Sequence, residues 1–305
     1  MKNRVVCLLG LPLDAVTMDE TVQRVREAAR TRQRLFLSTP NLNFLIGCRH
    51  DAAFRQSVID SDMSVADGMP LVWLSRLLGT PLPERVTGSG LFERLRSDPL
   101  PAGEAPLKVY FFGGAPGVAQ AASQQLNAMG GGLVCVGHES PGFGSIEDMS
   151  SAETLARIDA SGADFLVVAL GAAKGQAWIQ RNRARLQVPV LSHLGAVINF
   201  AAGTVSRAPA WMQKTGLEWL WRIKEEPALW RRYWRDGKAL LTLLPHALWL
   251  RRQARQAPAA TLTDDSGFRR LGIEACASLC RRSCSVATGT DATARLQRRN
   301  MRGKP

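Results

Sequence analysis

Hydroxyl, amide and carboxylate side chains follow two consecutive apolar runs near the start of this sequence. Thr39 and Asn41 come directly after the run LFLS, and Asp67 comes directly after the run SVA. If both runs are parallel strands, the three side chains lie at the edge of the sheet where ligands of such folds bind. Taken singly, the same residues also suit purely structural roles, TPN as a helix N-cap and DG as a tight turn.

Two glycine-rich turns indicate phosphate binding. Gly113 and Gly114 follow the run KVYFF and precede a helical pattern, and Gly171 follows FLVVAL in the same arrangement, with Lys174 and Gln176 as additional donors. Backbone NH groups at the start of a helix can hold a phosphate. Neither turn has the spacing of a dinucleotide fingerprint or a P-loop. Two such turns in one sheet favour a phosphorylated ligand more strongly than one does.

These candidate residues depend on strands and helices that alternate along residues 1–206. Strands are expected at Val5–Leu9, Leu35–Ser38, Ser64–Ala66, Lys108–Phe112, Leu133–Val136, Phe165–Leu170 and Val188–Leu191. Helices are expected at Asp19–Ala29, Asn43–Ile59, Pro70–Leu78, Gly117–Met129, Ser151–Ala160 and Gln176–Arg185. The alternation predicts an α/β domain, a Rossmann-like parallel sheet with helices on both faces.

The composition changes in residues 207–255. This segment holds six of the eight tryptophans and eleven Lys or Arg residues against four acids, and its pattern has a helical period. Tryptophan and arginine together are typical of a surface at the headgroup level of an anionic membrane. The structural alternative is a helical hairpin that packs its tryptophans on the core. We predict that 207–255 is a helical, basic and aromatic appendage that associates with a membrane.

The remaining totals limit the partners and the cofactors. A net charge of +13 calls for an acidic partner, which can be nucleic acid, anionic lipid or a phosphorylated small molecule. No segment reaches the roughly 18–20 apolar residues that cross a bilayer. Cys276, Cys280 and Cys284 share a helical spacing but lack a fourth ligand nearby, so no metal is expected. Residues 256–305 begin as a Pro/Ala/Thr linker, end basic, and are predicted to be mostly disordered.

Taken together, the segments resemble the bacterial glycosyltransferases of the WecG/TagA/CpsF family. The resemblance covers roughly Val5 to Leu244 and rests on motifs in matching order and spacing. The motifs are TPN at 39–41, ADG at 66–68, ERVTG at 84–88, FGG at 112–114, GAAKGQAWI at 171–179, RAP at 207–209 and GLEW at 216–219 followed by Arg222.

The resemblance implies an activity and a set of roles. Members of the family transfer a sugar from a UDP-sugar to a polyprenyl-diphosphate-linked acceptor, at the cytoplasmic face of the bacterial inner membrane, inverting the anomeric carbon without a tightly held metal. Asp67 would be the general base, and Thr39 and Asn41 would orient sugar or acceptor. Arg85 and the glycine-turn amides would neutralise the departing diphosphate. Arg222, Arg231 and Arg232 would reach the pocket from the appendage.

Three departures from the family pattern concern selectivity. Gly90 stands where the family often has aspartate in its G-x-D-L stretch, and Asn199 stands where aspartate is common. The usual G-x-P-K-Q-E reads GAAKGQ at 171–176 here, with Gly175 among the departures, and it loses the proline and the acid. Since Asp67, Arg85 and the arginine-rich end are kept, we expect retained catalysis with altered donor or acceptor selectivity.

Two alternatives from other classes stay open at this point. Basic charge interleaved with aromatic side chains also suits single-stranded nucleic acid, although here the charge concentrates in one terminal segment and no nucleic-acid motif is present. A noncatalytic scaffold at the lipid surface would keep the same fold without turnover. The glycosyltransferase hypothesis is the one that accounts for the strand ends, the glycine turns and the appendage together.

Overall fold

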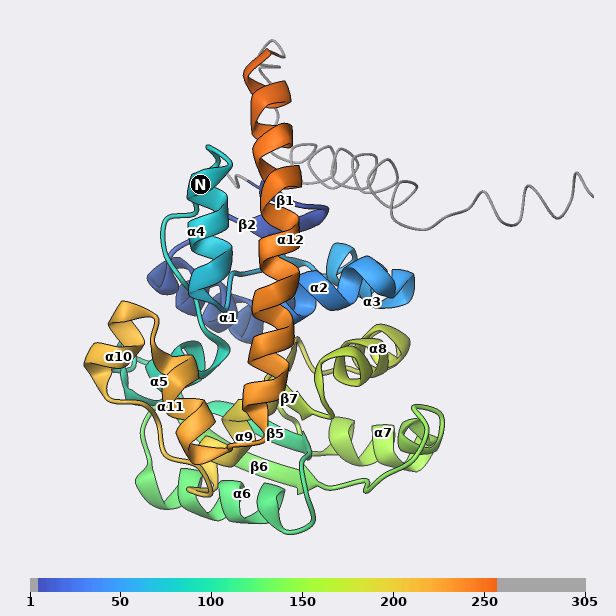
Figure 1. Ribbon diagram of the computed structural model, residues 1–305. Helices are drawn as coiled ribbons and strands as arrows, with labels where there is room; N and C mark the ends of the chain where they lie inside the picture. The colour runs from blue at the N-terminus through green and yellow to red at the C-terminus, as the bar shows by residue number, and fades with distance from the viewer. Residues whose placement is uncertain (1–4, 257–305) are drawn as a thin grey trace, which may run out of the picture.

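A parallel sheet forms the centre of the protein, in a computed structural model that describes residues 5–256. Six strands run in the order β4-β3-β8-β7-β5-β6, and every neighbouring pair is parallel (Figure 1). The strands are β3 (Leu35–Ser38), β4 (Met63–Ser64), β5 (Leu107–Gly113), β6 (Leu133–Glu139), β7 (Phe165–Ala169) and β8 (Val190–His193). The predicted α/β architecture is confirmed.

Helices cover both faces of the sheet because the strand side chains alternate between its two apolar faces. On one face Phe111 and Val167 pack against α1 (Met18–Thr31), α5 (Gly88–Ser97), α6 (Val118–Met129) and α9 (Gly195–Ala201). On the other face Phe112 and Val168 pack against α7 (Ala152–Ala160) and α8 (Ala172–Asn182), together with the 3-10 turn Asp148–Ser150. The stacked rings of Phe112 and Trp178, 4.5 Å between centroids, anchor α8 to the sheet.

A second core lies beside the β4 edge of the sheet. It joins the antiparallel hairpin β1 (Val5–Leu8) and β2 (Leu11–Asp14) to α2 (Leu42–His50), α3 (Ala52–Ile59) and α4 (Met69–Leu77). The carboxylate of Asp14 accepts the backbone NH of Ser64 at 2.8 Å, which ties this hairpin to the edge strand β4. The hairpin is therefore an accessory to the main sheet and not one of its strands.

Four elements differ from the predicted pattern, each for a local reason. Val5–Leu9 is only half of a hairpin, since Leu9 and Gly10 adopt positive φ angles of 49° and 95° and reverse the chain. The expected helix from Asn43 to Ile59 is two helices, because Asp51 leaves the helical conformation and caps α3. Helices α5 and α9 were not predicted, since both begin in glycine-containing sequence that reads as loop.

The appendage consists of α10 (Ala210–Thr215), α11 (Glu218–Glu225) and α12 (Leu229–Gln256). Helix α12 runs past α2 and on beyond the β1–β2 hairpin (Figure 1). Leu243 of α12 is buried in the second core, and Asn43 of α2 donates to the buried carboxylate of Asp236 at 3.5 Å. One face of α12 packs on the core and its other faces stay exposed. The helix is therefore compatible both with packing on the core and with the predicted contact to a membrane.

The tail 257–305, including Cys276, Cys280 and Cys284, lies outside the described residues, and the domain boundaries at 206 and 255 stay predictions. Among residues 5–256, no helix combines the length and apolar character that a membrane-crossing helix requires.

Candidate functional site

Backbone hydrogen bonds bring three loops together at the carboxyl edge of the sheet. The NH of Asp67 donates to the carbonyl of Pro40 at 2.7 Å, which joins the loop after β4 to the loop after β3. The NH of Val86 donates to the carbonyl of Ala66 at 3.0 Å, which adds the loop leading into α5. The polar residues at 39–41 and at 67 therefore lie at one edge, as the sequence predicted from the strand ends.

The Asp67 carboxylate is held at the start of α5. Its Oδ2 accepts the backbone NH of Gly88 at 3.2 Å, and its side chain is half-buried. Burial raises the pKa of Asp67 to about 7, and the negative charge of Glu218 acts in the same direction. The Gly88 hydrogen bond and the charges of Arg85 and Arg222 oppose this rise. Near neutral pH this carboxyl group can both hold and release a proton, as a general base requires.

The three loops meet around Asp67 in what we call the Asp67 corner. Thr39 and Asn41 lie in this corner on the β3 side. Thr39 is 4% exposed, and its Oγ1 and Cγ2 lie 3.6 Å from the position that a Cβ on Gly88 would occupy. Asn41 caps α2 by accepting the NH of Phe44 at 3.2 Å, and its Cβ lies 3.6 Å from the corresponding Cβ position on Gly68. The capping role of Asn41 is real, and its place beside Gly68 also puts it next to Asp67.

Arg85 connects the loop before α5 to the appendage. Its guanidinium donates to the carboxylate of Glu218 at 3.2 Å and to the backbone carbonyl of Gln213 at 2.6 Å. Both partners of this ion pair are largely buried, with 17% and 16% of their side chains exposed. The contacts fix the orientation of the guanidinium and hold α10 and α11 against the Asp67 corner.

The three predicted arginines of the appendage occupy different positions. Arg222 acts electrostatically on Asp67, lies 5.9 Å from the centroid of the Phe200 ring, and donates to Glu226 at 3.4 Å, while its buried Nε has no hydrogen-bond partner. Arg231 is exposed beside the Trp230 ring, and Arg232 lies over Tyr233 with a buried, unpartnered Nε. The charge of Arg222 lowers the pKa of Asp67, while Arg231 and Arg232 lie beside aromatic rings of α12.

The glycine turns lie farther along the same edge, after β5 and β7. Gly113 is buried, and a Cβ added to it would lie 2.5 Å from the carbonyl oxygen of Ala169, so this glycine is needed for close strand packing. Gly114 donates its NH to that same carbonyl at 2.9 Å. Gly171 is exposed in open space at the start of α8, a helix without a side-chain cap. Helix α6, which follows the first turn, likewise begins after an exposed glycine, Gly117, without a side-chain cap.

The two side-chain donors of the second turn have separate partners. Lys174 donates its Nζ to the carbonyl of Gly144 in the loop before α7. Gln176 is fully buried, where its amide donates to the Ser38 hydroxyl at 2.9 Å and links α8 to β3. A ligand role for either side chain stays a prediction.

Gly88 and Glu218 belong to the site but were not singled out from the sequence as site residues. Both lie inside motifs that resemble the family, ERVTG and GLEW, but the motifs alone did not indicate what either residue does. Glu218 is one of only four acids in the basic segment 207–255, and an acid retained among so many cations points to a specific partner. That partner is Arg85, far away along the chain.

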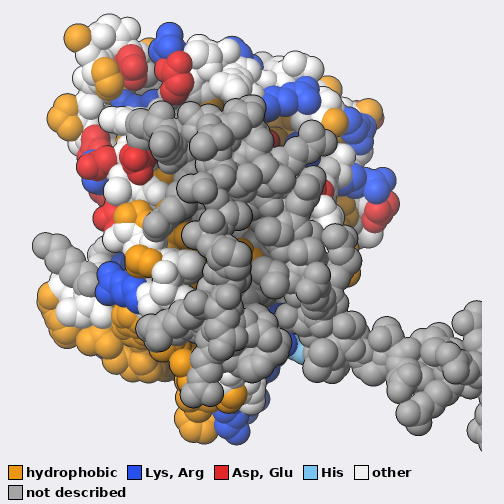
Figure 2. Space-filling view, turned by 90° about the horizontal axis from the view of Figure 1, so that it is seen from above, with side chains coloured by type: hydrophobic (Ala, Val, Ile, Leu, Met, Phe, Trp, Pro, Cys, Tyr) orange, Lys and Arg blue, Asp and Glu red, His pale blue; other side chains and the backbone are white. Residues whose placement is uncertain are grey.

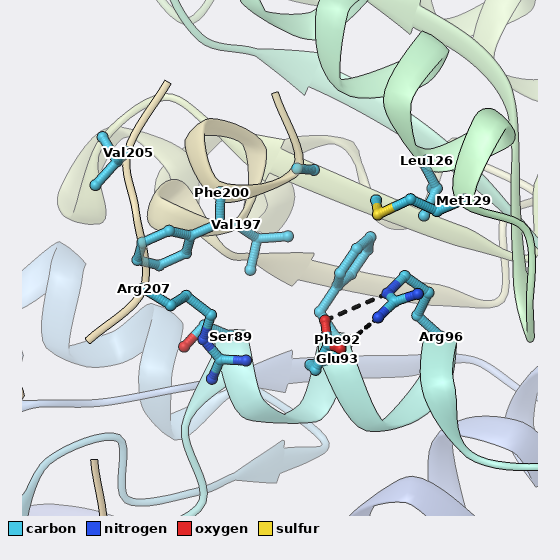
Figure 3. A pocket seen from close by; sticks show the side chains of 11 residues that line it. Ser89, Phe92, Glu93, Arg96, Leu126, Met129, Val197, Phe200, Val205 and Arg207 are labelled. Carbon is cyan, nitrogen blue, oxygen red and sulfur yellow. Dashed lines mark hydrogen bonds and ion pairs between the residues drawn. The ribbon is translucent and has the colours of Figure 1, made fainter. Parts of the chain in front are cut away.

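A pocket adjoins this corner between α5, α6 and α9 (Figure 3). It encloses about 150 Å³ and has largely apolar walls, with Phe92, Met129 and Phe200 among them. Arg207 lines its other side, near Ser89 at the start of α5. Asp67 does not line this pocket, and the link between the two regions is Phe200, which lines the pocket and has the Arg222 guanidinium over its ring.

Comparisons with known proteins identify relatives of this chain. Residues 6–256 match the family described as "Glycosyl transferase WecG/TagA/CpsF family". The chain is 28% identical, over 69% of its length and 79% of the relative, to an N-acetylglucosaminyldiphosphoundecaprenol N-acetyl-beta-D-mannosaminyltransferase of Bacillus spizizenii. It is 26% identical to a protein of the same description from Staphylococcus aureus, over 71% of this chain and 83% of the relative.

Proposed function

Because this chain belongs to the WecG/TagA/CpsF family and is a glycosyltransferase, we propose that it moves a sugar from a UDP-sugar onto a polyprenyl-diphosphate-linked sugar. The product would serve bacterial cell-surface or exopolysaccharide synthesis. The observation that carries the proposal is Asp67, a half-buried carboxyl group with a pKa of about 7 at the shared edge of three loops. Its position matches the ADG motif of the family.

Asp67 would act as the general base in a single displacement. Its carboxylate takes the proton from the acceptor hydroxyl while the oxygen of that hydroxyl forms a bond to the anomeric carbon. The bond from this carbon to the UDP oxygen breaks at the same time, so UDP leaves with the electron pair and the configuration inverts. Thr39 and Asn41, which flank the carboxylate, would orient the two sugars.

Arginines and helix starts would receive the charge that grows on the leaving diphosphate. Arg85 is already oriented by Gln213 and Glu218, and the Arg222 guanidinium acts on the same corner. The uncapped start of α8 at Gly171 adds backbone NH groups and the positive end of a helix dipole. Fixed positive charge of this kind stabilises a developing anion. No metal is required by this scheme, and no cofactor beyond the donor is proposed.

An anionic membrane surface is proposed as the second partner, with the protein peripheral on the cytoplasmic face of the bacterial inner membrane. The support is chemical: a lipid-linked acceptor must be met at a bilayer, and the exposed tryptophans of the appendage alternate with arginines. Figure 2 shows hydrophobic side chains gathered at the left of the molecule, the side on which α4 and α10 lie in Figure 1. On α4, Trp73 is 50% exposed and adds to the apolar surface that the appendage offers.

A donor screen tests the proposed function directly. The full chain is incubated with a panel of UDP-sugars, including UDP-N-acetylmannosamine, and a short-chain polyprenyl-diphosphate-N-acetylglucosamine, and UDP release is measured. We expect release that depends on the acceptor and is limited to one donor or a few. A chain that releases no UDP with any donor of the panel in the presence of the acceptor would contradict the proposal.

Replacing Glu218 with glutamine is expected to move the pH dependence of transfer to lower pH. Glu218 raises the pKa of Asp67 and also occupies Arg85, so its removal lowers the pKa of Asp67 through both effects. The midpoint of the rising limb of kcat against pH should fall below 7 by up to about 1 pH unit. The control is E225Q, an exposed acid of the same helix that does not act on Asp67. A midpoint that stays put or rises in E218Q would refute the assignment of that limb to Asp67.

A further inference from the structure

His193 is a buried histidine at the carboxyl edge of the sheet that the proposed mechanism does not use. It is the last residue of β8, a central strand between β3 and β7, and it is 8% exposed. Its Nε2 is buried and has no hydrogen-bond partner among the described residues. Buried polar atoms in proteins are nearly always hydrogen-bonded, so an exception of this kind asks for an explanation.

Two glycines make room for the imidazole. A Cβ on Gly175 would lie 2.3 Å from the His193 Cδ2, and a Cβ on Gly195 would lie 3.2 Å from Nε2. Gly175 is inside α8, where glycine is less favourable than alanine, and any larger residue there would collide with the ring. In this chain the imidazole therefore occupies space into which a side chain at position 175 would project.

His193 lies close to the proposed catalytic corner. The next residue, Leu194, packs against Gly88, since a Cβ on Gly88 would lie 2.5 Å from the Leu194 Cδ2. Gly88 is the residue whose NH holds the Asp67 carboxylate. On its other side the imidazole lies 6.2 Å, between ring centroids, from Phe44 of α2. The ring thus sits at the edge between α2 and α8, near the uncapped start of α8 proposed for the donor diphosphate.

The environment keeps the imidazole neutral. Burial lowers the pKa of His193 to about 4, so near pH 7 it carries one NH donor and one acceptor nitrogen. A side chain that served only to fill this space would be better apolar, because a ring without nitrogen leaves no orphaned polar atom. A polar group brought by a substrate accounts for both the nitrogen and its lack of a protein partner.

We propose that His193 is a specificity-determining residue that hydrogen-bonds a hydroxyl or amide group of the transferred sugar. The assignment rests on the proposed function, since it takes the donor to be a UDP-sugar bound along α8.

The test compares two substitutions that separate polarity from packing. H193F keeps a ring at this position and removes both nitrogens, whereas H193Q keeps an amide near the Nε2 position. With UDP-N-acetylmannosamine and the other donors of the panel, H193F is expected to lower kcat/KM for the preferred donor by roughly 10-fold or more, chiefly through KM. H193Q should retain more of the wild-type value. The thermal midpoint of H193F should equal or exceed that of the wild type.

The test has one control variant, and three outcomes would overturn the proposal. H138F alters an exposed histidine on β6 and should leave kcat/KM unchanged. Wild-type kcat/KM in H193F for every donor would overturn the His193 proposal alone. Equal losses in H193F and H193Q that follow equal losses of thermal stability would also overturn it, by showing a packing role. Absence of transfer by the wild-type chain with every donor would overturn the proposed function and this inference with it.

Discussion

Replacing Asp67 with asparagine is expected to lower sugar transfer by at least about 100-fold while the protein stays folded. Asparagine has nearly the same shape and still accepts the NH of Gly88 through its amide oxygen, so the corner between the three loops is kept. It cannot take a proton from the acceptor hydroxyl. The measurement is UDP release with acceptor present, alongside binding of UDP by calorimetry, which should change little.

The same substitution has a second expected effect, on stability, because the pKa of Asp67 is raised in the folded protein. A raised pKa means that the folded state binds the proton more tightly than the unfolded state, whose aspartates titrate near 3.9. The stability that the protonated group contributes is full below about pH 4 and is lost as the pH rises through about 7. D67N lacks this loss, so above pH 7 its free energy of unfolding should exceed that of the wild type by roughly 1–4 kcal/mol.

A control separates the two effects from general damage. Asp19 is an exposed acid of α1, paired with Arg94, and D19N should change neither transfer nor the pH dependence of stability appreciably. Near-normal turnover by D67N would remove Asp67 from the role of base. A D67N protein less stable than the wild type at pH 8 would show that the carboxylate stabilises the folded state, contrary to its environment here.

The triple substitution W211A/W230A/W234A is expected to weaken binding to anionic vesicles by about 100-fold without unfolding the protein. These side chains are 61%, 51% and 62% exposed, so they contribute little to the core. If each loses about 1 kcal/mol of apolar burial in the headgroup region, the sum corresponds to about two powers of ten in affinity. Sedimentation with vesicles of phosphatidylglycerol and phosphatidylcholine measures the change.

The control for the triple substitution is a substitution of another exposed aromatic residue. Phe143, in the loop before α7, is 98% exposed and lies outside the appendage, so F143A should bind vesicles as the wild type does. Undiminished sedimentation of the triple variant would show that the lipid contact lies elsewhere. Point substitutions suit this test better than truncation after residue 206, because truncation would remove Leu243 and open the second core.

The sequence predicted those parts of the site that depend on chain direction and strand ends. Thr39, Asn41 and Asp67 each follow an apolar run directly, and in a parallel sheet such positions converge whatever the details of packing. The hairpin turn at Leu9-Gly10 and the break at Asp51 were missed because a single short apolar run or helical pattern does not reveal where the backbone changes conformation. Aspartate at position 51 suits a helix cap, but the spacing of the apolar residues shows no break in the helix there.

Contacts between distant segments could not be predicted. Arg85 and Glu218 are 133 residues apart along the chain, and their pairing depends on how α11 packs against the loop before α5. The same holds for His193, whose ring fits only because glycine occurs at 175 on another element. A lone histidine in a sequence is more often a packing residue, and only the orphaned Nε2 at the sheet edge distinguishes it.

The burial of Leu243 fixes the position of α12 against the rest of the protein. The helix has 28 residues, which corresponds to about 42 Å, and its packing on α2 fixes its register against the body that carries Asn41 and Asp67. A bilayer that contacts the exposed side chains of α12 would then lie at a fixed distance from the reacting carbon. Sliding α12 by one helical turn would change that distance by about 5.4 Å, enough to take a lipid-tethered hydroxyl out of reach of its base.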